Sequence, residues 1–358
     1  MRLVLSRRLA DLPVRRDQWN ALVAETAGAT VFQTYEWFEC WWAAFGYGRE
    51  LFLVTMWEGE LLAGLAPLMI QRRFGVRRLE FVSTSNADYQ DFILGKRSAE
   101  LLPALMRFVC EQRTAWDMMV LRNVPTESPT FALLPEIVRA LGLGVTDTER
   151  VDCPTIKIAS RPNEIRKLLN RYSLRRRVTG LRQRGELAFM RCTTAEQLDR
   201  YLPRFFDQYV ERRRGSTAAV AFQQLDVRAF YDSLARSLLR SGWLHFSVLE
   251  CAGRQVAFHF GFEFDGRLYW YKPSFDPSFA RNSPGKVLLS FLIRDASERQ
   301  LQELDLTVGT EAFKYRYTST HRTNANLRVF SHSWLYHVFL GVGWMQRTLR
   351  KWRRTRAG

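Results

Sequence analysis

The sequence predicts an α/β chain (α+β) of two consecutive domains, each a mostly antiparallel sheet flanked by helices. The first observation is length, because 358 residues exceed the ~100–200 residues of an ordinary single domain. The second is composition, since 47% hydrophobic and 13% aromatic residues favour packed globular structure over disorder. The third is a succession of helices, β-meander, helix and strand that occurs twice, in residues 1–150 and 151–332.

The first domain is expected to open with helices and continue as a meander. A helix at 34–45 would place Trp37, Trp41 and Trp42 on one face. The glycine of Glu58-Gly59-Glu60 marks a tight turn between two strand-like segments, which predicts a β-hairpin. The expected order is a strand at 3–5, helices at 17–26 and 34–45, strands at 51–57, 61–71, 78–83 and 91–94, a helix at 98–113, a strand at 118–123 and a helix at 129–141.

The second domain repeats this pattern. Gly253 and Gly266 each separate two strand-like segments, so both predict hairpin turns. The expected order is a strand at 154–159, a helix at 163–184, a strand at 186–191, helices at 195–214 and 226–241, strands at 244–251, 255–263 and 267–274, a helix at 284–300, and strands at 304–308 and 326–331.

The chain carries a net charge of +17, from 53 Lys and Arg against 36 Asp and Glu. Such a charge attracts nucleic acid, anionic lipid or nucleotide phosphates, and does not choose among them. One basic cluster spans residues 161–184, and another ends the chain at 347–356. Residues 333–358 form a basic amphipathic tail, which either lies on an anionic membrane surface or packs its apolar start on the second domain.

Cysteine and histidine usage argues against a disulfide scaffold and against a metal site. The five cysteines are odd in number, with no C-x-x-C pair, and the five histidines form no H-E-x-x-H motif. The N-terminus lacks the apolar region of a signal peptide, and no window of about 18 apolar residues predicts a membrane span. We therefore expect a cytoplasmic protein, peripheral at the inner face of the membrane if the tail binds lipid.

The strongest local signal is Ser283-Pro284-Gly285-Lys286, which begins the helix after the second meander. Proline suits the first helical position, and the preceding serine can cap the helix. The N–H groups of such a helix start, together with its dipole, suit a phosphate. Lys286 is disfavoured there by the dipole and is easier to explain beside an anion. The alternative is an ordinary capped helix.

The next strand carries candidate acid–base residues. Asp305 alternates with apolar neighbours, and a carboxylate inside a sheet is costly unless it is solvated, paired or used. Glu311, Lys314 and Tyr315 lie within one turn if this segment is helical, and a neighbouring lysine can tune a carboxylate for proton transfer. The alternative is a structural Asp305 with a surface Glu311–Lys314 pair.

These motifs together resemble the CelD-like (cellulose-biosynthesis-type) acetyltransferase family of the GNAT superfamily, which is related to the Fem-type transferases. The resemblance lies in S-P-G before a helix and in the later D-F-x-x-G-x-x-x-Y-K pattern. Leu306 replaces its usual aromatic residue, and Phe313 stands where tyrosine is common. It covers roughly residues 15–330 and includes the aromatic segment 32–42, the D-Y-x-D loop at 85–91, Leu174-Arg175-Arg176-Arg177 and residues 271–276.

The resemblance implies two tandem GNAT-like acyl-CoA N-acyltransferase domains, the first of them degenerate. It implies acyl-CoA or acetyl-CoA as co-substrate, with no metal, and a pyrophosphate at Ser283, Pro284, Gly285 and Lys286 of the second domain. We expect Asp305 or Glu311 to act as base and Tyr315 as acid. We expect Asp88, Tyr89, Asp91 and Lys314 to bind the acceptor.

The expected function is an acyl-CoA-dependent N- or O-acyltransferase acting on a small amine or sugar-like acceptor, in exopolysaccharide or envelope biosynthesis. One alternative is a Fem-like aminoacyl transferase that uses aminoacyl-tRNA, which the basic cluster at 161–184 favours. Another is a non-catalytic partner of a membrane polysaccharide machine, docked through residues 334–356. The sequence determines neither the acceptor, the acyl chain length nor the oligomeric state.

Overall fold

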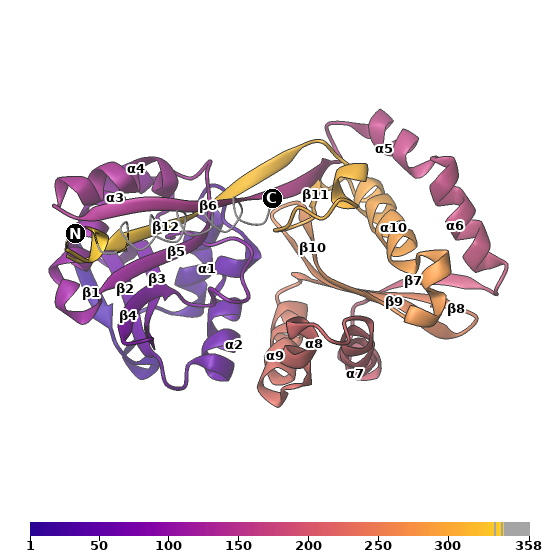
Figure 1. Cartoon of the computed structure of the whole chain (residues 1–358), viewed down its shortest axis with the longest axis horizontal. Coiled ribbons are helices and arrows are strands. Elements are labelled where there is room, and N and C mark those ends of the chain that lie inside the picture. Colours follow the sequence, from indigo (N-terminus) through magenta and orange to yellow (C-terminus); the bar gives the residue numbers. More distant parts are fainter. Residues whose placement is uncertain (333, 338, 340–358) are drawn as a thin grey trace, which may run out of the picture. The chain divides into compact units, whose positions relative to one another are not determined.

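The computed structural model describes residues 1–332, 334–337 and 339. The chain forms two compact units. The first contains residues 1–35 and 48–150 and the described residues from 323 onward, and the second contains residues 36–47 and 151–322. Each unit has its own helices and sheet strands, as the predicted α/β class requires (Figure 1).

The first unit is built on a sheet with the strand order β1-β2-β3-β4-β5-β12. Its neighbours pair antiparallel except β4 and β5, which are parallel. The predicted strand at 91–94 is reduced to one bridge between Leu65 and Ile93. The strands are β1 (Arg2–Ser6), β2 (Glu50–Glu58), β3 (Leu61–Arg73), β4 (Val76–Phe81), β5 (Met118–Pro125) and β12 (His321–Phe330).

Three helices cover this sheet, α1 (Arg16–Glu25), α3 (Ser98–Glu111) and α4 (Pro129–Ala140). Both α3 and α4 lie on the same face, where their leucines join the main core of the unit (Figure 1). The apolar residues of α3 recur at helical spacing, with Leu101, Leu102 and Leu105 all buried, so the local sequence pattern determines which side of the helix faces the sheet.

Helix α2 (Tyr35–Phe45) packs in the second unit, although its sequence lies among segments of the first. Trp37 is fully buried there, edge-on to Phe230, Phe262 and Tyr271 at centroid distances of 5.8, 5.5 and 5.9 Å. The predicted division into residues 1–150 and 151–332 is therefore wrong for this helix. Its aromatic face was predicted, but the identity of the surface that buries it depends on residues about 200 positions away.

The second unit is built on a sheet with the strand order β6-β11-β10-β9-β8-β7. Only β10 and β11 pair parallel, and the other neighbours are antiparallel. The strands are β6 (Gly144–Lys157), β7 (Leu187–Cys192), β8 (Leu244–Cys251), β9 (Arg254–Phe264), β10 (Arg267–Phe275) and β11 (Glu303–Asp305). The hairpin turns predicted at Gly253 and Gly266 are confirmed, and both glycines have positive φ.

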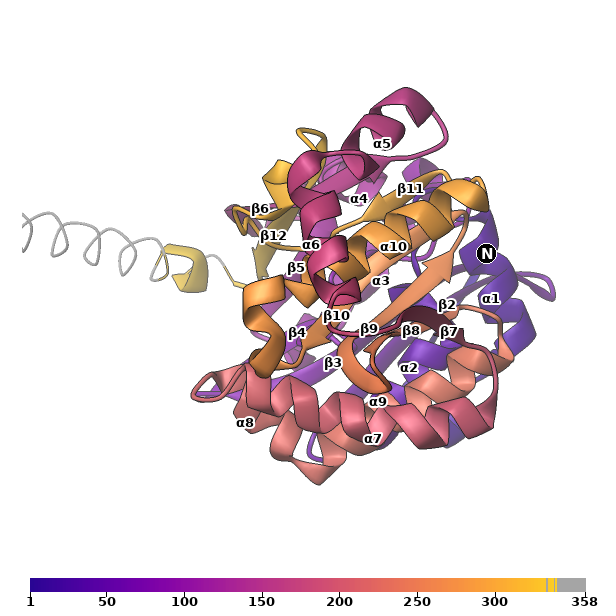
Figure 2. The ribbon, with the colours of Figure 1, turned by 90° about the vertical axis from the view of Figure 1, so that its right-hand side faces the viewer.

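Helices cover both faces of this sheet (Figure 1). One face carries α7 (Ala195–Arg212), α8 (Thr217–Gln223) and α9 (Leu225–Arg240), and the other carries α5 (Pro162–Leu169), α6 (Tyr172–Arg182) and α10 (Pro284–Glu298). Figure 2 shows α10 crossing the strands with α6 beside it. The single helix predicted at 163–184 is wrong, because the helix ends at Leu169 and a second one begins at Tyr172.

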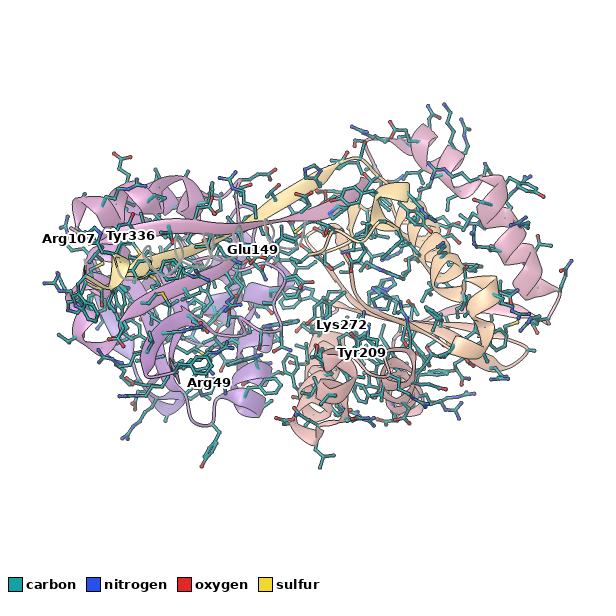
Figure 3. All side chains as sticks on the ribbon, in the orientation of Figure 1. Arg49, Arg107, Glu149, Tyr209, Lys272 and Tyr336 are labelled. Carbon is teal, nitrogen blue, oxygen red and sulfur yellow. The ribbon has the colours of Figure 1, made fainter. Side chains whose placement is uncertain are left out.

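The two faces of the β8–β9 ladder differ in chemistry because side chains alternate along each strand. Phe246, Phe258 and Phe260 face α7, where Phe205 contacts all three at 5.7 to 6.1 Å. Tyr209, labelled in Figure 3, extends this aromatic layer along α7. The opposite face, toward α10, contains Leu249 and Ala257 together with the buried polar side chains of His245, Ser247 and His259.

The described part of the C-terminal tail contacts the first unit. Phe330 at the end of β12 lies 5.6 Å from the ring of Tyr336 and 5.2 Å from that of Phe339. The expectation that the apolar start of the tail packs on the second domain is therefore wrong, because β12 returns the chain to the first unit. The predicted basic end of the tail lies outside the described residues. Within residues 1–332, no helix is long and apolar enough to cross a membrane.

Candidate functional site

The second unit contains a fork between its two parallel strands. β10 pairs with β11 only from Arg267 to Tyr269, and the last pair joins Tyr269 to Asp305. β10 then continues to Phe275, while the chain after Asp305 turns away through Thr307, whose φ is 57°. α10 follows β10 after a short 3-10 helix, so the fork and the start of α10 lie in successive parts of one βα unit.

Asp305 lies at the fork with its charge already neutralised. Its side chain is 1% exposed, and Oδ1 accepts a 2.7 Å hydrogen bond from the Thr307 amide. Arg322 donates to Oδ2 at 3.3 Å and also contacts Glu303 at 2.6 Å. Because a guanidinium and an amide stabilise the charged carboxylate, these contacts favour the structural alternative for Asp305 over the predicted base.

Lys314 closes the loop that follows the fork. Its side chain is buried, and Nζ donates to the carbonyls of Thr307 and Val308 at 3.1 and 2.9 Å and lies 3.0 Å from Glu311. Gly309 has φ 132°, a backbone conformation that residues with a side chain rarely adopt, and a Cβ atom there would also lie 2.3 Å from the Glu311 carboxylate. These contacts give Lys314 a structural part in the loop, and its predicted acceptor contact stays a prediction.

Among the predicted catalytic residues that lie on a helix or strand, Tyr315 is the most exposed. It belongs to the 3-10 helix Lys314–Arg316, and its side chain is 41% exposed. The hydroxyl donates a 2.8 Å hydrogen bond to Asp152, and this bond raises the pKa of Tyr315. The hydroxyl proton is thus held by Asp152, and the role of Tyr315 as acid stays a prediction.

The start of α10 differs from the predicted capped helix. Ser283 has a left-handed backbone (φ 53°, ψ 53°), and its side chain makes no capping hydrogen bond. Its carbonyl accepts from the amides of Lys286 and Val287 at 2.9 and 3.3 Å. Pro284 has no amide hydrogen, so among the first three residues of α10 only the Gly285 N–H is left for an anion. The predicted anion site at the start of α10 therefore offers fewer backbone N–H donors than expected.

Side-chain cations supplement this helix start. Burial, then Arg177 of α6 and Arg316 of the 3-10 helix, lower the pKa of Lys286. In the part of the chain that the structure describes, no carboxylate forms an ion pair with Lys286, Arg177 or Arg316. Arg177, Arg316 and Lys286 are thus like charges from three elements that interact electrostatically and form no ion pair with a carboxylate, an arrangement that favours binding of an anion. We call these residues the α10 cation cluster.

Two buried histidines lie on the α10 face of the sheet and were missed in the sequence. His259 Nε2 lies 3.1 Å from the carbonyl of Tyr269, so the neutral ring can donate a hydrogen bond to this residue of the fork. A Cβ atom at Gly261 would come within 2.2 Å of that ring, so glycine makes room for it. His245 Nε2 lies 3.3 Å from Asp295 of α10. The sequence signal that could have identified them is a polar side chain at an inward-facing position of β8 and of β9.

Buried histidines make stability dependent on pH. Burial lowers the pKa of His245 and lowers that of His259 well below its usual 6.5, so both are neutral in the folded state. The unfolded chain binds more protons below pH 6.5, so the free energy of unfolding falls as pH decreases, by up to about 1.4 kcal/mol per pH unit for each histidine. Urea unfolding at pH 7.5 and 5.5 should show this loss. A His245→Gln/His259→Gln variant should lose less, and an equal loss would contradict the assignment.

The predicted acceptor loop belongs to the first unit. Tyr89 is buried against Phe32 at 6.2 Å, and Asn324 donates a 2.8 Å hydrogen bond to the carbonyl of Asp88. Burial raises the pKa of Asp91 to about 6, against the opposing effect of hydroxyl hydrogen bonds. Asp88, Tyr89 and Asp91 thus lie in a different unit from Lys314, and their predicted acceptor contacts stay predictions.

Comparison with known proteins identifies the second unit. Residues 158–315 match the family model described as an acetyltransferase (GNAT) domain. These residues are therefore similar to a GNAT acetyltransferase domain. The match spans the α5–α6 pair, the fork and the start of α10. It does not distinguish the CelD-like family from other GNAT domains. Among residues 1–332, no three His, Cys, Asp or Glu side chains lie close enough together to bind a metal ion.

Solved structures show the same fold over almost the whole chain. FemX superposes with a TM-score of 0.64 at 12% identity, covering 94% of this chain and 99% of FemX. L-PGS from Bacillus licheniformis gives 0.56 at 12% identity, covering 92% and 95%. A tandem GNAT protein from the clavulanic acid biosynthesis pathway gives 0.51 at 10% identity, covering 92% and 99%. These likenesses confirm the predicted tandem GNAT-like fold. No curated protein sequence matches the chain.

Proposed function

We propose that the protein transfers an acyl group from acyl-CoA or acetyl-CoA to a small amine or sugar-like acceptor. The observation that carries this proposal is the α10 cation cluster at the helix start of a GNAT domain. The pyrophosphate of CoA is a polyanion, and binding it would relieve the repulsion among Lys286, Arg177 and Arg316. The Gly285 N–H and the dipole of α10 add to the same site.

The chemistry requires two proton transfers around one displacement. The acceptor nitrogen or oxygen attacks the thioester carbonyl carbon and loses its proton to a base, while the C–S bond breaks and the thiolate takes a proton from an acid. We assign Glu311 as the base, because its side chain is 57% exposed whereas Asp305 is buried and paired. We assign Tyr315 as the acid.

Tyr315→Phe should lower kcat about 10- to 100-fold, because the ring remains and only the transferable proton is lost. KM for acyl-CoA should stay nearly unchanged, since the hydroxyl contacts Asp152 rather than the α10 cation cluster. Release of free thiol measures both constants. Tyr172→Phe, at an exposed tyrosine of α6, is the matched control. Equal rates for both variants would remove Tyr315 from the mechanism.

A screen of acetyl-CoA and longer acyl-CoAs against pooled amines and sugars, read by mass spectrometry, tests the function as a whole. The expected result is an acceptor heavier by one acyl group, together with free CoA. Absence of transfer in the screen, combined with absence of CoA binding by calorimetry, would overturn the proposal. An envelope or exopolysaccharide role would follow only if the acceptor found were a precursor of such a polymer.

A second candidate is an aminoacyl transferase that takes its donor from aminoacyl-tRNA. It is favoured by the α5–α6 surface, where Tyr172 is 72% exposed among cations. Exposed aromatic rings between basic residues suit nucleic acid, because bases stack on the rings and phosphates pair with the charges. Binding of tRNA with a steep salt dependence, without CoA binding, would favour this candidate. The cations are Arg161, Arg166, Lys167, Arg171, Arg175, Arg176, Arg177, Arg182 and Arg184.

The non-catalytic alternative depends on the basic tail, most of which lies outside the described residues. It stays a prediction from the sequence. Binding to anionic vesicles, measured for the full chain and for a chain ending at residue 339, tests it directly. Vesicle binding that is lost on truncation, with no acyl transfer in the screen, would favour it over the enzyme.

A further inference from the structure

Strand β10 contains a bulge at the fork. Its pairing with β9 is regular up to Tyr269 and resumes at Lys272, three residues on, while β9 advances by only two residues. Trp270 and Tyr271 therefore oppose the single residue Gly261, which is the two-against-one arrangement of a β-bulge. A bulge interrupts the backbone ladder and changes the direction of the side chains beside it. We call this feature the β10 bulge.

The side chain of His259 lies in the β10 bulge. Its ring is fully buried and stacks on Trp270, with ring centroids 4.9 Å apart and planes 14° from parallel. Nε2 lies 3.1 Å from the Tyr269 carbonyl, and because a carbonyl only accepts hydrogen bonds, Nε2 carries the proton. A Cβ atom at Gly261 would lie 2.2 Å from this ring and 2.3 Å from the same carbonyl. The glycine opposite the bulge therefore makes room for the ring and for its hydrogen bond.

One hydroxyl joins the β10 bulge to the loop that follows β11. Thr307 Oγ1 donates a 3.2 Å hydrogen bond to the carbonyl of Trp270, the residue on which His259 stacks. The left-handed backbone of Thr307, at φ 57°, is unfavourable for a β-branched residue and needs support from its contacts. Its amide bonds Asp305 at 2.7 Å, and its carbonyl bonds Lys314 at 3.1 Å. The β10 bulge thus supplies one of the three contacts that hold Thr307.

The loop that begins at Thr307 carries the two residues assigned to proton transfer. Glu311 lies 3.0 Å from Lys314, whose Nζ also donates to the Thr307 carbonyl. Tyr315 follows Lys314 in the same 3-10 helix. A displacement of Thr307 therefore reaches Glu311 and Tyr315 through a single buried lysine.

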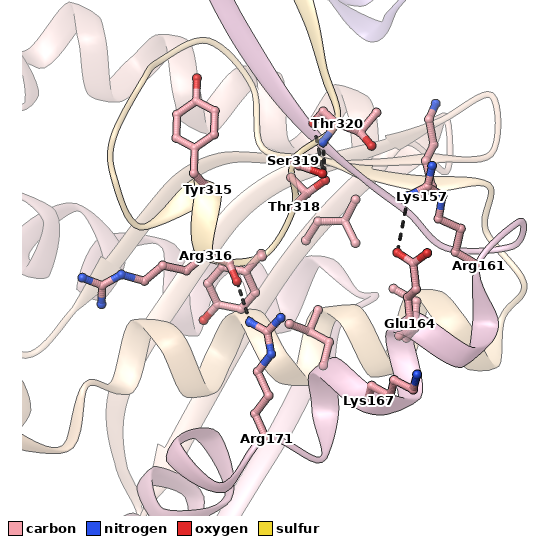
Figure 4. A pocket seen from close by; sticks show the side chains of 14 residues that line it. Lys157, Arg161, Glu164, Lys167, Arg171, Tyr315, Arg316, Thr318, Ser319 and Thr320 are labelled. Carbon is pink, nitrogen blue, oxygen red and sulfur yellow. Dashed lines mark hydrogen bonds and ion pairs between the residues drawn. The ribbon is translucent and has the colours of Figure 1, made fainter.

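The far end of this loop is anchored independently of the β10 bulge. Thr318 Oγ1 donates to the carbonyl of Thr155 on β6 at 2.8 Å and accepts from the amide of Thr320 at 3.0 Å. Figure 4 shows this turn, with the side chain of Tyr315 pointing away from it. Since the far end is fixed to β6, the position of Thr307 decides how the residues between them lie.

We propose that His259 is a positioning residue for acyl transfer. Its ring holds the β10 bulge, the bulge holds Thr307, and Thr307 sets the loop that carries Glu311 and Tyr315. His259 is buried on the α10 face, so it acts through this loop and not on the reacting atoms. The inference rests on the proposed function, since it assumes that Glu311 and Tyr315 move the protons. His245, the other buried histidine on this face, contacts α10 instead and has no such role.

Turnover of the full chain tests this role. His259→Phe keeps a ring beside Trp270 and removes the donor, so kcat should fall about 10- to 100-fold while KM for acetyl-CoA stays within about twofold. His259→Gln restores an N–H near the position of Nε2 and should recover most of the loss. His245→Gln is the matched control and should leave both constants nearly unchanged. Release of free thiol from acetyl-CoA, with the acceptor that the screen identifies, measures both constants.

A double-mutant cycle joins the two ends of the path. Thr307→Val removes only the hydroxyl that bonds Trp270 and should itself lower kcat about tenfold. Adding it to His259→Phe should lower kcat little further, because both changes act on the same bulge, whereas independent sites would multiply their effects. Multiplied effects would contradict the path. If His259→Phe loses its fold, Thr307→Val carries the test alone, and an unchanged kcat in it would overturn the inference.

Hydrogen exchange followed by mass spectrometry gives a readout that needs no activity. The amides of residues 307–317 should exchange faster in His259→Phe than in the unaltered chain, because the loop loses support at one end. Those of α7, on the opposite face of the sheet, should keep their rates and so show that the fold is intact. His245→Gln should leave the exchange of residues 307–317 unchanged.

The outcomes separate this inference from the function on which it rests. Equal kcat for His259→Phe and the unaltered chain would overturn the positioning role and leave acyl transfer intact. Equal losses of kcat in His259→Phe and His245→Gln would assign both to general destabilisation and overturn it as well. Absence of acyl transfer by the unaltered chain would overturn the proposed function, and the role of His259 with it, even where the exchange of residues 307–317 differed.

Discussion

The double charge reversal Lys286→Glu/Arg316→Glu is expected to lower the affinity for CoA about 100-fold, or about 2.8 kcal/mol. The two residues come from α10 and from the 3-10 helix, and neither forms an ion pair within the described chain. Each charge-assisted hydrogen bond to a phosphate contributes roughly 1.5–3 kcal/mol, so the loss follows from removing two such contacts. Reversal, rather than neutralisation, adds repulsion to the loss.

Isothermal calorimetry at two salt concentrations measures this effect. CoA binding to the unaltered chain should weaken with salt, since exposed charges are screened over roughly 10 Å at 0.1 M. The double reversal should lose most of that salt dependence. Lys286→Arg/Arg316→Lys keeps both charges and should bind within about tenfold of the unaltered chain. Unchanged CoA affinity after the double reversal would remove the α10 cation cluster from the donor site.

Trp37→Ala should destabilise the second unit by about 3–5 kcal/mol, the usual cost of truncating a buried tryptophan. Trp37 is 0% exposed and contacts aromatic rings of α9, β9 and β10. Its removal leaves a cavity that rigid rings cannot easily fill. Helix α2 belongs to the sequence of the predicted first domain but packs in the second unit. Weaker packing of α2 should therefore destabilise the second unit and leave the core of the first intact.

Differential scanning calorimetry should show the effect as a lowered transition temperature. A shift of ~2–4 °C is expected for each kcal/mol lost in a unit of this size. Trp42→Ala is the matched control on the same helix, because Trp42 is half-exposed and stacks only loosely on Phe38 at 6.4 Å. Similar shifts for both variants would contradict the packing of α2 described here.

The elements that the sequence predicted well are those whose signals are local. Strands β8, β9 and β10 are apolar segments separated by turns, and the turns at Gly253 and Gly266 have the positive φ that glycine tolerates. The start of α10 could also be predicted from the sequence, since proline favours a first helical position. The break between α5 and α6 was missed, because Asn170 and Arg171 interrupt the helix without a glycine or proline to mark the position.

The candidate site shows the same difference between features with local sequence signals and features that depend on distant residues. The sequence by itself determined the hairpins at Gly253 and Gly266, the helix start at Pro284 and the proximity of Glu311 to Lys314, because each depends on residues a few positions apart. Only the tertiary structure decided that Arg177 and Arg316 approach Lys286, that Arg322 neutralises Asp305, and that α2 packs in the second unit. Those contacts join distant segments, and nothing in local propensity or periodicity specifies which distant charge or ring becomes a neighbour.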